Sequence, residues 1–231
     1  MRSRPLIYAA RGAAAAVVLL IVSTLFASTA ASGVTPSLIN GSGSSWAANA
    51  VNQWVTDVAN QGIQVVYSPD GDSAGRQDFA NGTSDFAVTA EGYQGVDPAT
   101  GLDDTSNGRK YVYVPIAAGG TSFPYQIRFD GHQVENLRLS GETLAKIFTN
   151  QITNWDNPAI TQDNNGVALP SLPITPVVQA EGSGATQQLS GYFAKQYPQI
   201  WQAFAGSPDA TEYWPRQGNQ VAENGSNQAM N

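Results

Sequence analysis

Residues 36–67 read PSLINGSGSSWAANAVNQWVTDVANQGIQVVY, a pattern typical of a strand, a loop, a helix and a second strand. The short apolar run 36–40 leads into a glycine and serine loop at 41–45. Apolar residues then recur at three- and four-residue steps from Ala47 to Val58, which predicts an amphipathic helix. The compact apolar run 63–67 predicts a buried strand. Two strands joined by a helix of this length predict a parallel βαβ unit.

The alternation of strands and helices continues along the rest of the chain. Ser140 has the residue type and position of a helix N-cap, because Thr143, Leu144, Ile147 and Phe148 follow it at helical spacing. Such alternation predicts an α/β fold. The other expected elements are strands at 85–89, 111–118, 123–129 and 174–178, helices at 76–80 and 141–148, and a helix that follows the glycines at 182–184.

The N-terminal segment predicts export. Arg2, Arg4 and Arg11 precede an uncharged run at 12–26, and small residues follow at 27–32. A basic region, an apolar core and a small-residue zone are the three parts of a secretory signal, so residues 1–31 are expected to be a signal peptide. An uncleaved N-terminal membrane anchor is the alternative, although the run is shorter than the roughly 20 apolar residues of a spanning helix. The expected location is secreted or extracytoplasmic, in the periplasm or cell envelope.

Composition excludes several classes of function. The chain is 42% hydrophobic and 13% charged, as in a globular protein, and it has no cysteine and one histidine, His132. Disulfide frameworks, thiol catalysis and cysteine-ligated zinc are therefore excluded. Without residues 1–31, eight basic residues stand against 18 acidic ones, a net charge of −10. Binding to nucleic acid or to an anionic membrane surface needs clustered positive charge. We therefore expect no nucleic-acid partner, and membrane contact only through the signal or anchor segment.

Three loops share one pattern: a strand ends, small residues follow and a helix begins. They lie at 41–45, 71–75 and 182–186. In α/β folds ligands bind beyond the carboxyl ends of strands, where free helix N–H groups and the helix dipole favour anions. Serine hydroxyls add further donors. The pattern favours a cleft for an anion or another polar ligand, and the alternative is that each loop only caps its helix.

Other motifs do not predict enzymatic or metal chemistry. The segment 70–75 begins like a calcium loop, but Ala74 replaces the third ligand and Asn81 stands where a bidentate glutamate is needed. No lysine follows a glycine-rich loop as in nucleotide-binding proteins. Ser45 or Ser183 as a nucleophile needs a base, and His132 lies in a polar loop. We expect no enzyme, no metal and no cofactor.

A longer segment, LSGETLAKIFTNQITNWDNPAI at 139–160, resembles the phosphate-binding proteins of high-affinity phosphate ABC transporters, the PstS type. The segments 41–46, 67–75, 85–87 and 181–184 share this resemblance, which runs from about Leu38 to the last residue. The resemblance implies a periplasmic-binding-protein-like (type II), two-lobed α/β sandwich. Family members continue well beyond this point, so the chain looks truncated at its C-terminus. The expected lobes are 35–118 and an incomplete 119–231.

The resemblance also implies a site. Such proteins hold dehydrated phosphate through backbone N–H groups, hydroxyls, one arginine and an acceptor carboxylate. Matching positions that offer donors are Ser45, Trp46, Ser183 and Gly184. Departures from the pattern are Asp72 where a serine is expected, with Ser73 next; Gln179 at the arginine position; Ala90 at the aspartate position, with Glu91 next; and Ala185 at a threonine position, with Thr186 next.

Arg76 lies one helical turn after Asp72, so it either supplies the missing positive charge or pairs with Asp72, and we expect the pair. The resemblance implies a monomeric solute-binding protein that takes inorganic phosphate or a related oxyanion to an ABC transporter permease. The alternative is a degenerate solute-binding domain that serves as an extracellular interaction module. Gln179, Ala90 and Ala185 favour that alternative.

Overall fold

The computed structural model describes residues 36–96, 101 and 103–230. The expected signal or anchor at 1–31 lies outside the described residues. Within the described part of the chain, no helix is long and apolar enough to cross a membrane. Residues Leu38–Asn231 form one unit of the chain.

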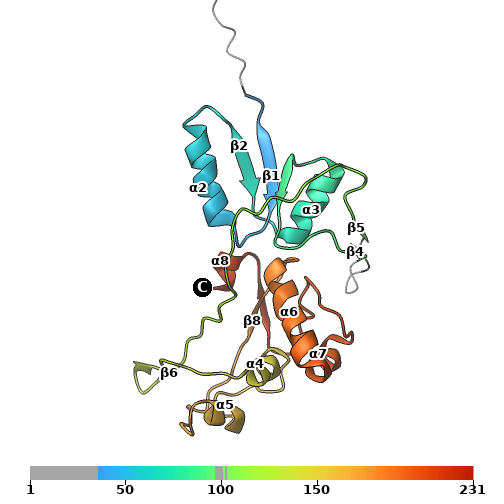
Figure 1. Ribbon diagram of the computed structural model, residues 1–231. Helices are drawn as coiled ribbons and strands as arrows, with labels where there is room; N and C mark the ends of the chain where they lie inside the picture. The colour runs from blue at the N-terminus through green and yellow to red at the C-terminus, as the bar shows by residue number, and fades with distance from the viewer. Residues whose placement is uncertain (1–35, 97–100, 102, 231) are drawn as a thin grey trace, which may run out of the picture. The chain divides into compact units, whose positions relative to one another are not determined.

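A three-stranded parallel sheet forms the first part of this unit. Its strands are β1 (Ile39–Gly43), β2 (Val65–Ser68) and β3 (Phe86–Val88), in the order β2-β1-β3. The helix α2 (Ala48–Ala59) joins β1 to β2, and α3 (Asp72–Asn81) joins β2 to β3. The first connection leads from β1 to its neighbour β2, and the second leads back past β1 to β3. Connections that run in opposite directions place their helices on opposite sides of a sheet, as α2 and α3 lie here (Figure 1). The predicted βαβ unit is confirmed, but its first strand lies at 39–43 instead of 36–40, so residues 41–43 of the predicted first loop are strand.

The sheet has a small apolar core, and close packing around the sheet requires glycine at two positions. Ala47, Val51, Tyr67 and Val88 are buried together. A Cβ on Gly41 would lie 2.0 Å from the Phe86 ring of the neighbouring strand. A Cβ on Gly75 would lie 2.5 Å from the Cα atom of Gly43, so the absence of a side chain lets α3 pack directly on the end of β1.

The second part of the unit contains more helix than strand. Its first helix, α4 (Gly141–Phe148), begins as predicted, since the Ser140 hydroxyl accepts a hydrogen bond from the Thr143 N–H. Asn157 caps α5 (Pro158–Asp163) in the same way. The elements that follow are β8 (Val177–Gln179), α6 (Gly184–Gln196), α7 (Pro198–Ala205), β9 (Val221–Glu223) and α8 (Ser226–Ala229).

An aromatic core holds these elements together. Trp201, Phe193 and Trp214 are buried, with the rings of Trp201 and Trp214 5.5 Å apart. They pack against Ala145 of α4 and Val178 of β8. A separate cluster of four buried isoleucines lies between α4, α5 and the segment before β8. The strands β8 and β9 pair in parallel, with Gln179 beside Glu223 in register.

Two short antiparallel pairs complete the described strands. One joins β4 (Gly95–Val96) to β5 (Asp103–Asp104), and the other joins β6 (Arg128–Phe129) to β7 (His132–Gln133). His132 is exposed on the second pair, as its polar surroundings in the sequence predict.

The predicted strands at 111–118 and 123–129 are wrong, apart from the two residues of β6. Between 111 and 127 the described chain has no strand, and Val112 is 84% exposed. A strand needs a ladder partner, and Pro115 and Pro124 each lack one backbone donor. The helix expected at 76–80 instead begins at Asp72, so the loop predicted at 71–75 is mostly helical.

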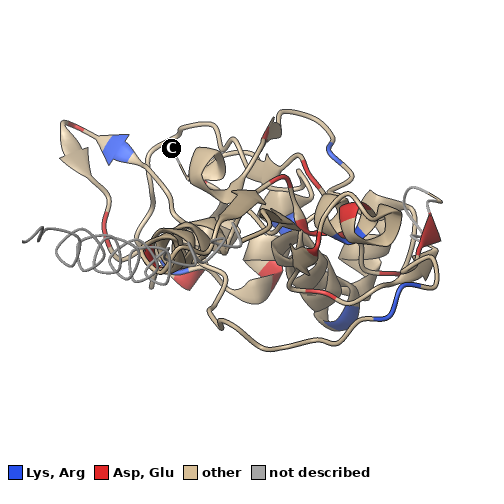
Figure 2. Ribbon diagram, turned by 90° about the horizontal axis from the view of Figure 1, so that it is seen from above, with Lys and Arg blue, Asp and Glu red and all other residues tan. Residues whose placement is uncertain are grey.

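Charged groups are spread thinly over the molecule. Figure 2 shows the blue basic positions scattered along the ribbon rather than gathered in one place. The described residues therefore show no basic cluster in this view that would attract a polyanion.

The close approach of α3 to β1 yields a test of stability. Gly75→Ala should lower the free energy of unfolding by about 1–3 kcal/mol, because the new Cβ meets backbone atoms that cannot move independently. Gly191→Ala in α6 is the matched control, since its Cβ would meet only the Ala210 Cβ at 3.6 Å. The control should be neutral or stabilising by up to about 1 kcal/mol. Urea denaturation measures both, and an equal loss in the two variants would contradict the packing argument.

Candidate functional site

The three small-residue loops predicted from the sequence contact one another. The Gly71 N–H donates to the Gly43 carbonyl at 2.9 Å, which joins the first two loops. The Ser73 N–H donates to the Gly182 carbonyl at 3.3 Å, which joins the second loop to the third. The carboxyl end of the parallel sheet and the start of α6 therefore share one polar region, as the pattern predicts.

Ser45, from the first loop, also reaches the third. Its hydroxyl donates to Oε1 of Glu181 at 3.0 Å and accepts from the Ser226 N–H at 3.1 Å. The start of α8 is thus a fourth segment at this place, which the sequence analysis missed. The signal that could have found it is Gly225 followed by Ser226, which repeats the small-residue pattern of the other loops.

Glu181 is also absent from the site residues predicted from the sequence. Its Oε1 accepts from the Ser45 hydroxyl and from Nε2 of Gln179, the latter at 3.2 Å. Its Oε2 accepts from the Gly225 N–H at 3.0 Å. One carboxylate therefore collects donors from the first loop, from the end of β8 and from the start of α8.

Ser183 serves chiefly as the cap of α6. Its hydroxyl accepts from the Thr186 N–H at 3.2 Å and donates to Oε1 of Gln179 at 2.6 Å. Gly184 lies against Ala90, because a Cβ on Gly184 would come within 2.4 Å of the Ala90 Cβ. Ala185 is half-buried next to them. The capping alternative therefore holds for the Ser183 hydroxyl in this structure.

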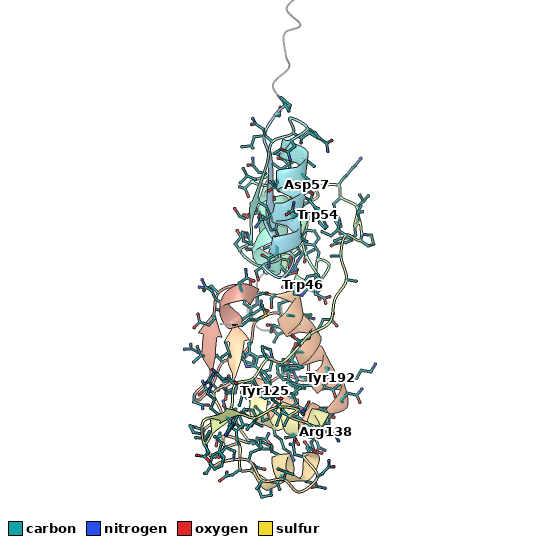
Figure 3. All side chains as sticks on the ribbon, turned by 90° about the vertical axis from the view of Figure 1, so that its left-hand side faces the viewer. Trp46, Trp54, Asp57, Tyr125, Arg138 and Tyr192 are labelled. Carbon is teal, nitrogen blue, oxygen red and sulfur yellow. The ribbon has the colours of Figure 1, made fainter. Side chains whose placement is uncertain are left out.

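Trp46 and Ser73 are positioned by neighbouring residues outside the loops. Trp46 is 46% exposed at the foot of α2 (Figure 3), and its ring packs over Gly119. The Ser73 hydroxyl is buried and accepts from the Tyr213 hydroxyl at 2.8 Å.

Arg76 does not pair with Asp72, so that expectation is wrong. Its Nε donates to both carboxylate oxygens of Asp104, at 2.9 and 3.0 Å, and its Nη2 donates to Oε2 of Glu212 at 2.6 Å. Asp72 is itself buried, and its Oδ1 accepts from the Ala90 N–H at 2.5 Å. Arg76 is 1% exposed and is held by two carboxylates and the Thr89 hydroxyl, so it is not available to contact a ligand.

The buried group formed by Arg76, Asp104 and Glu212 contains two carboxyl groups and one guanidinium. Burial by itself would lower the pKa of Arg76, but the hydrogen bonds with Glu212 and Asp104 raise it well above its usual range. Burial raises the pKa of Glu212, and Arg76 offsets only part of that rise. Oε1 of Glu212 is buried without a hydrogen-bond partner in the described part of the chain. Ionised Glu212 is therefore held at a cost in stability.

A second buried group lies under the first loop. The Tyr67 hydroxyl donates to the Ser44 carbonyl at 2.9 Å. Burial, together with the charges of Asp72 and Asp70, raises the pKa of Tyr67 well above its usual value. The phenol thus stays protonated and keeps donating to the loop at every ordinary pH.

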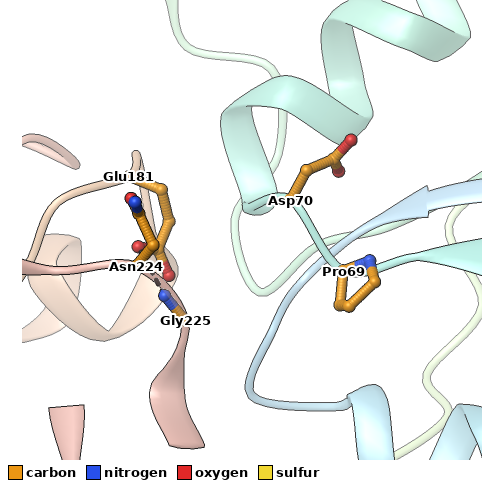
Figure 4. A pocket seen from close by; sticks show the side chains of 5 residues that line it. All are labelled: Pro69, Asp70, Glu181, Asn224 and Gly225. Atoms are coloured by element: carbon orange, nitrogen blue, oxygen red, sulfur yellow. Dashed lines mark hydrogen bonds between the residues drawn. The ribbon is translucent and has the colours of Figure 1, made fainter. Parts of the chain in front are cut away.

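A cavity of about 270 Å³ lies beside Glu181 (Figure 4). Pro69 and Asp70 line one side, and Glu181, Asn224 and Gly225 line the other. Burial raises the pKa of Asp70, although hydrogen bonds to its carboxylate partly offset this. The lining holds two carboxylates and no basic side chain. Among the residues that the structure describes, no cluster of His, Asp or Glu has the composition of a metal site.

The model of a family described as "PBP superfamily domain" matches residues 29–230. The chain belongs to the PBP superfamily. This agrees with the α/β, periplasmic-binding-protein-like fold that the sequence predicts. The family explains why strand ends and helix starts from distant segments meet at one polar region, since ligands of open α/β folds bind there.

Relatives within this superfamily have names that refer to phosphate. "Phosphate-binding protein PstS 2" of Mycobacterium tuberculosis is 31% identical over 159 residues, which is 67% of this chain and 41% of the relative. "Phosphate-binding protein PstS" of Xylella fastidiosa is 30% identical over 178 residues, which is 77% of this chain and 46% of the relative. The chain thus matches less than half the length of these relatives. A phosphate transport receptor from Vibrio cholerae aligns over 83% of this chain and 64% of its own, with a TM-score of 0.41 and 18% identity.

The Arg76 group predicts a large effect on stability. Arg76→Met should lower the free energy of unfolding by about 3–5 kcal/mol, because Asp104 and Glu212 would be left as buried charges without a cation. Arg138→Met is the control, since Arg138 is exposed (Figure 3) and should change stability by no more than about 0.5 kcal/mol. Urea denaturation separates the two, and a small effect at Arg76 would show that the buried network is not needed for stability.

The raised pKa of Glu212 predicts a dependence of stability on pH. In the window between the ordinary glutamate value of 4.5 and the higher folded-state pKa, the folded protein binds more protons than the unfolded chain. The free energy of unfolding should therefore fall as pH rises through that window. Glu212→Gln should lose the part of this slope that Glu212 causes and keep the part from Asp70. Unfolding midpoints across the window measure it, and identical slopes for wild type and variant would refute the assignment.

Proposed function

We propose that this chain is part of an extracytoplasmic solute-binding protein that takes phosphate or a similar oxyanion to an ABC transporter permease. Residues 1–31 would export it as a signal peptide or tether it as an N-terminal anchor. The expected lobes are 35–118 and 119–231, and the protein acts as a monomer. The names of its relatives support this reading.

The observation that carries the proposal is the set of donors around Glu181. A serine hydroxyl, a side-chain amide and a backbone N–H from three distant segments all point at one carboxylate. A carboxylate is an oxyanion, so the same donors suit the oxygens of phosphate. Donors of this kind bind an anion without net positive charge.

The hydrogen bonds of the serine hydroxyls favour ligand binding over catalysis. The Ser183 hydroxyl donates to the amide oxygen of Gln179, and an amide oxygen is too weak a base to activate a nucleophile. The one histidine, His132, lies on β7 and is exposed. We therefore propose no enzymatic activity and no cofactor.

A second candidate is the degenerate interaction module. Two observations about positive charge favour it. Gln179 stands at the arginine position, and Arg76 is paired with Asp104 and Glu212. Without a charged donor the affinity for phosphate should fall by about one to two decades. Phosphate binding distinguishes the two candidates directly.

Isothermal titration calorimetry of the full-length protein with inorganic phosphate tests the proposal. We expect saturable heat, and Ser45→Ala should weaken binding about tenfold or more, because it removes a hydroxyl that donates to an anion. Ser171→Ala, at an exposed serine on another loop, should bind as the wild type does. Absence of heat at millimolar phosphate in the folded protein would reject phosphate as the ligand and favour the interaction module.

A further inference from the structure

Glu181 already has the hydrogen-bonding environment of a bound anion. Each oxygen of its carboxylate is engaged: Oε1 by the Ser45 hydroxyl and the Gln179 amide, and Oε2 by the Gly225 N–H. Ser45 lies 136 residues from Glu181 in the chain, and Gly225 lies 44 residues from it. Glu181 is therefore held by three segments of the chain, and its carboxylate has the donors that a bound oxyanion would need.

The donors have few protons to spare for a second anion. The Ser45 hydroxyl has one proton, and it goes to Glu181. The Gln179 amide has two, of which one goes to Glu181 and the other to the Ser226 hydroxyl at 3.0 Å. The Gly225 N–H has one, which also goes to Glu181. An external oxyanion would need the same protons, so the two anions exclude each other.

The local packing favours this position of the side chain. A Cβ on Gly71 would come within 2.9 Å of the Glu181 Cγ, so a glycine there leaves room for the glutamate stem. Gly71 also has a φ of 111°, which strains other residue types. Among the residues described, no basic side chain forms an ion pair with Glu181 that would draw it away.

The charge of the surroundings acts in the same direction. Asp70 lines the cavity opposite Glu181, so an anion that enters meets two carboxylates and no cation. Two negative groups close together repel a third, and the repulsion grows where water is partly excluded. Removal of the Glu181 charge would relieve the repulsion and free the donors at once.

We infer that Glu181 acts as an internal ligand, whose carboxylate competes with small external oxyanions for Ser45, Gln179 and Gly225. The inference rests on the proposed function, because it takes these donors to be the ligand-binding groups. Wild-type protein then binds a small oxyanion only when the Glu181 side chain leaves, which lowers its apparent affinity.

The first test compares phosphate affinity in the full-length protein by calorimetry. Glu181→Ala and the isosteric Glu181→Gln should both bind phosphate at least about tenfold more tightly than wild type. Glu223→Gln is the matched control, because Glu223 is the register partner of Gln179 and its substitution removes the same charge nearby. Its affinity should stay close to that of wild type, so that a general change in net charge is separated from release of the donors.

The second test does not depend on phosphate. In Glu181→Ala the vacated donors should donate to free acetate, so acetate should raise the unfolding temperature of this variant relative to chloride at equal ionic strength. Wild type and Glu223→Ala should show no such difference. If Glu181→Ala does not fold, the affinity comparison with Glu181→Gln still decides the matter.

The outcomes separate the two proposals. Acetate protection of Glu181→Ala without phosphate binding by any variant supports the internal ligand and rejects phosphate as the solute. Phosphate binding of equal strength in wild type and both Glu181 variants overturns the internal ligand and leaves the proposed function standing. Weaker binding by Glu181→Gln also overturns it, because Glu181 would then contact the bound ligand instead of competing with it. If acetate does not protect Glu181→Ala and no variant binds phosphate, both proposals are overturned.

Discussion

The buried guanidinium of Arg76 is the interaction on which the rest of the described structure depends. It lies on α3 and joins Asp104 of β5 to Glu212, in the segment between α7 and β9. The same segment places Tyr213 on Ser73, and its Glu212 carbonyl accepts from the Ser183 N–H. One cation thus holds together the elements that carry the second and third loops. A cation that is buried and paired with two carboxylates is not available to a ligand.

This constraint accounts for the character of the polar site. The loops offer hydroxyls and backbone N–H groups, but the positive charge nearby is committed to structure. The position from which an arginine would act holds Gln179, whose amide donates to Glu181 and to Ser226. In the described part of the chain, the Glu181 carboxylate is therefore stabilised by hydrogen bonds and has no ion pair. Membership in the PBP superfamily and a site with little positive charge are both properties of this chain.

Local pattern was enough to predict the features that local physics determines. The parallel βαβ unit follows from apolar spacing at 36–67, and the Ser140 cap follows from residue type and position. The contact between the first two loops follows from the rule that the carboxyl ends of parallel strands meet at one edge of a sheet, whereas the third loop follows β8, which pairs with β9 in a separate sheet. These features depend on residues close in sequence or on topology, so one sequence without relatives suffices to find them.

Other features depend on partners that are distant in sequence. Arg76 meets Asp104 across 28 residues and Glu212 across 136, so its nearer neighbour Asp72 was the wrong choice. Strands at 111–118 and 123–129 were predicted from β-forming residues, and only the two residues of β6 are strand, because a strand requires a ladder partner that composition does not reveal. The most direct test of the account is phosphate titration of Gln179→Arg at low ionic strength. The account predicts affinity at least about tenfold above wild type, since the new cation would bind the anion and engage Glu181. Equal or weaker affinity in the folded variant would contradict the claim that missing positive charge limits this site.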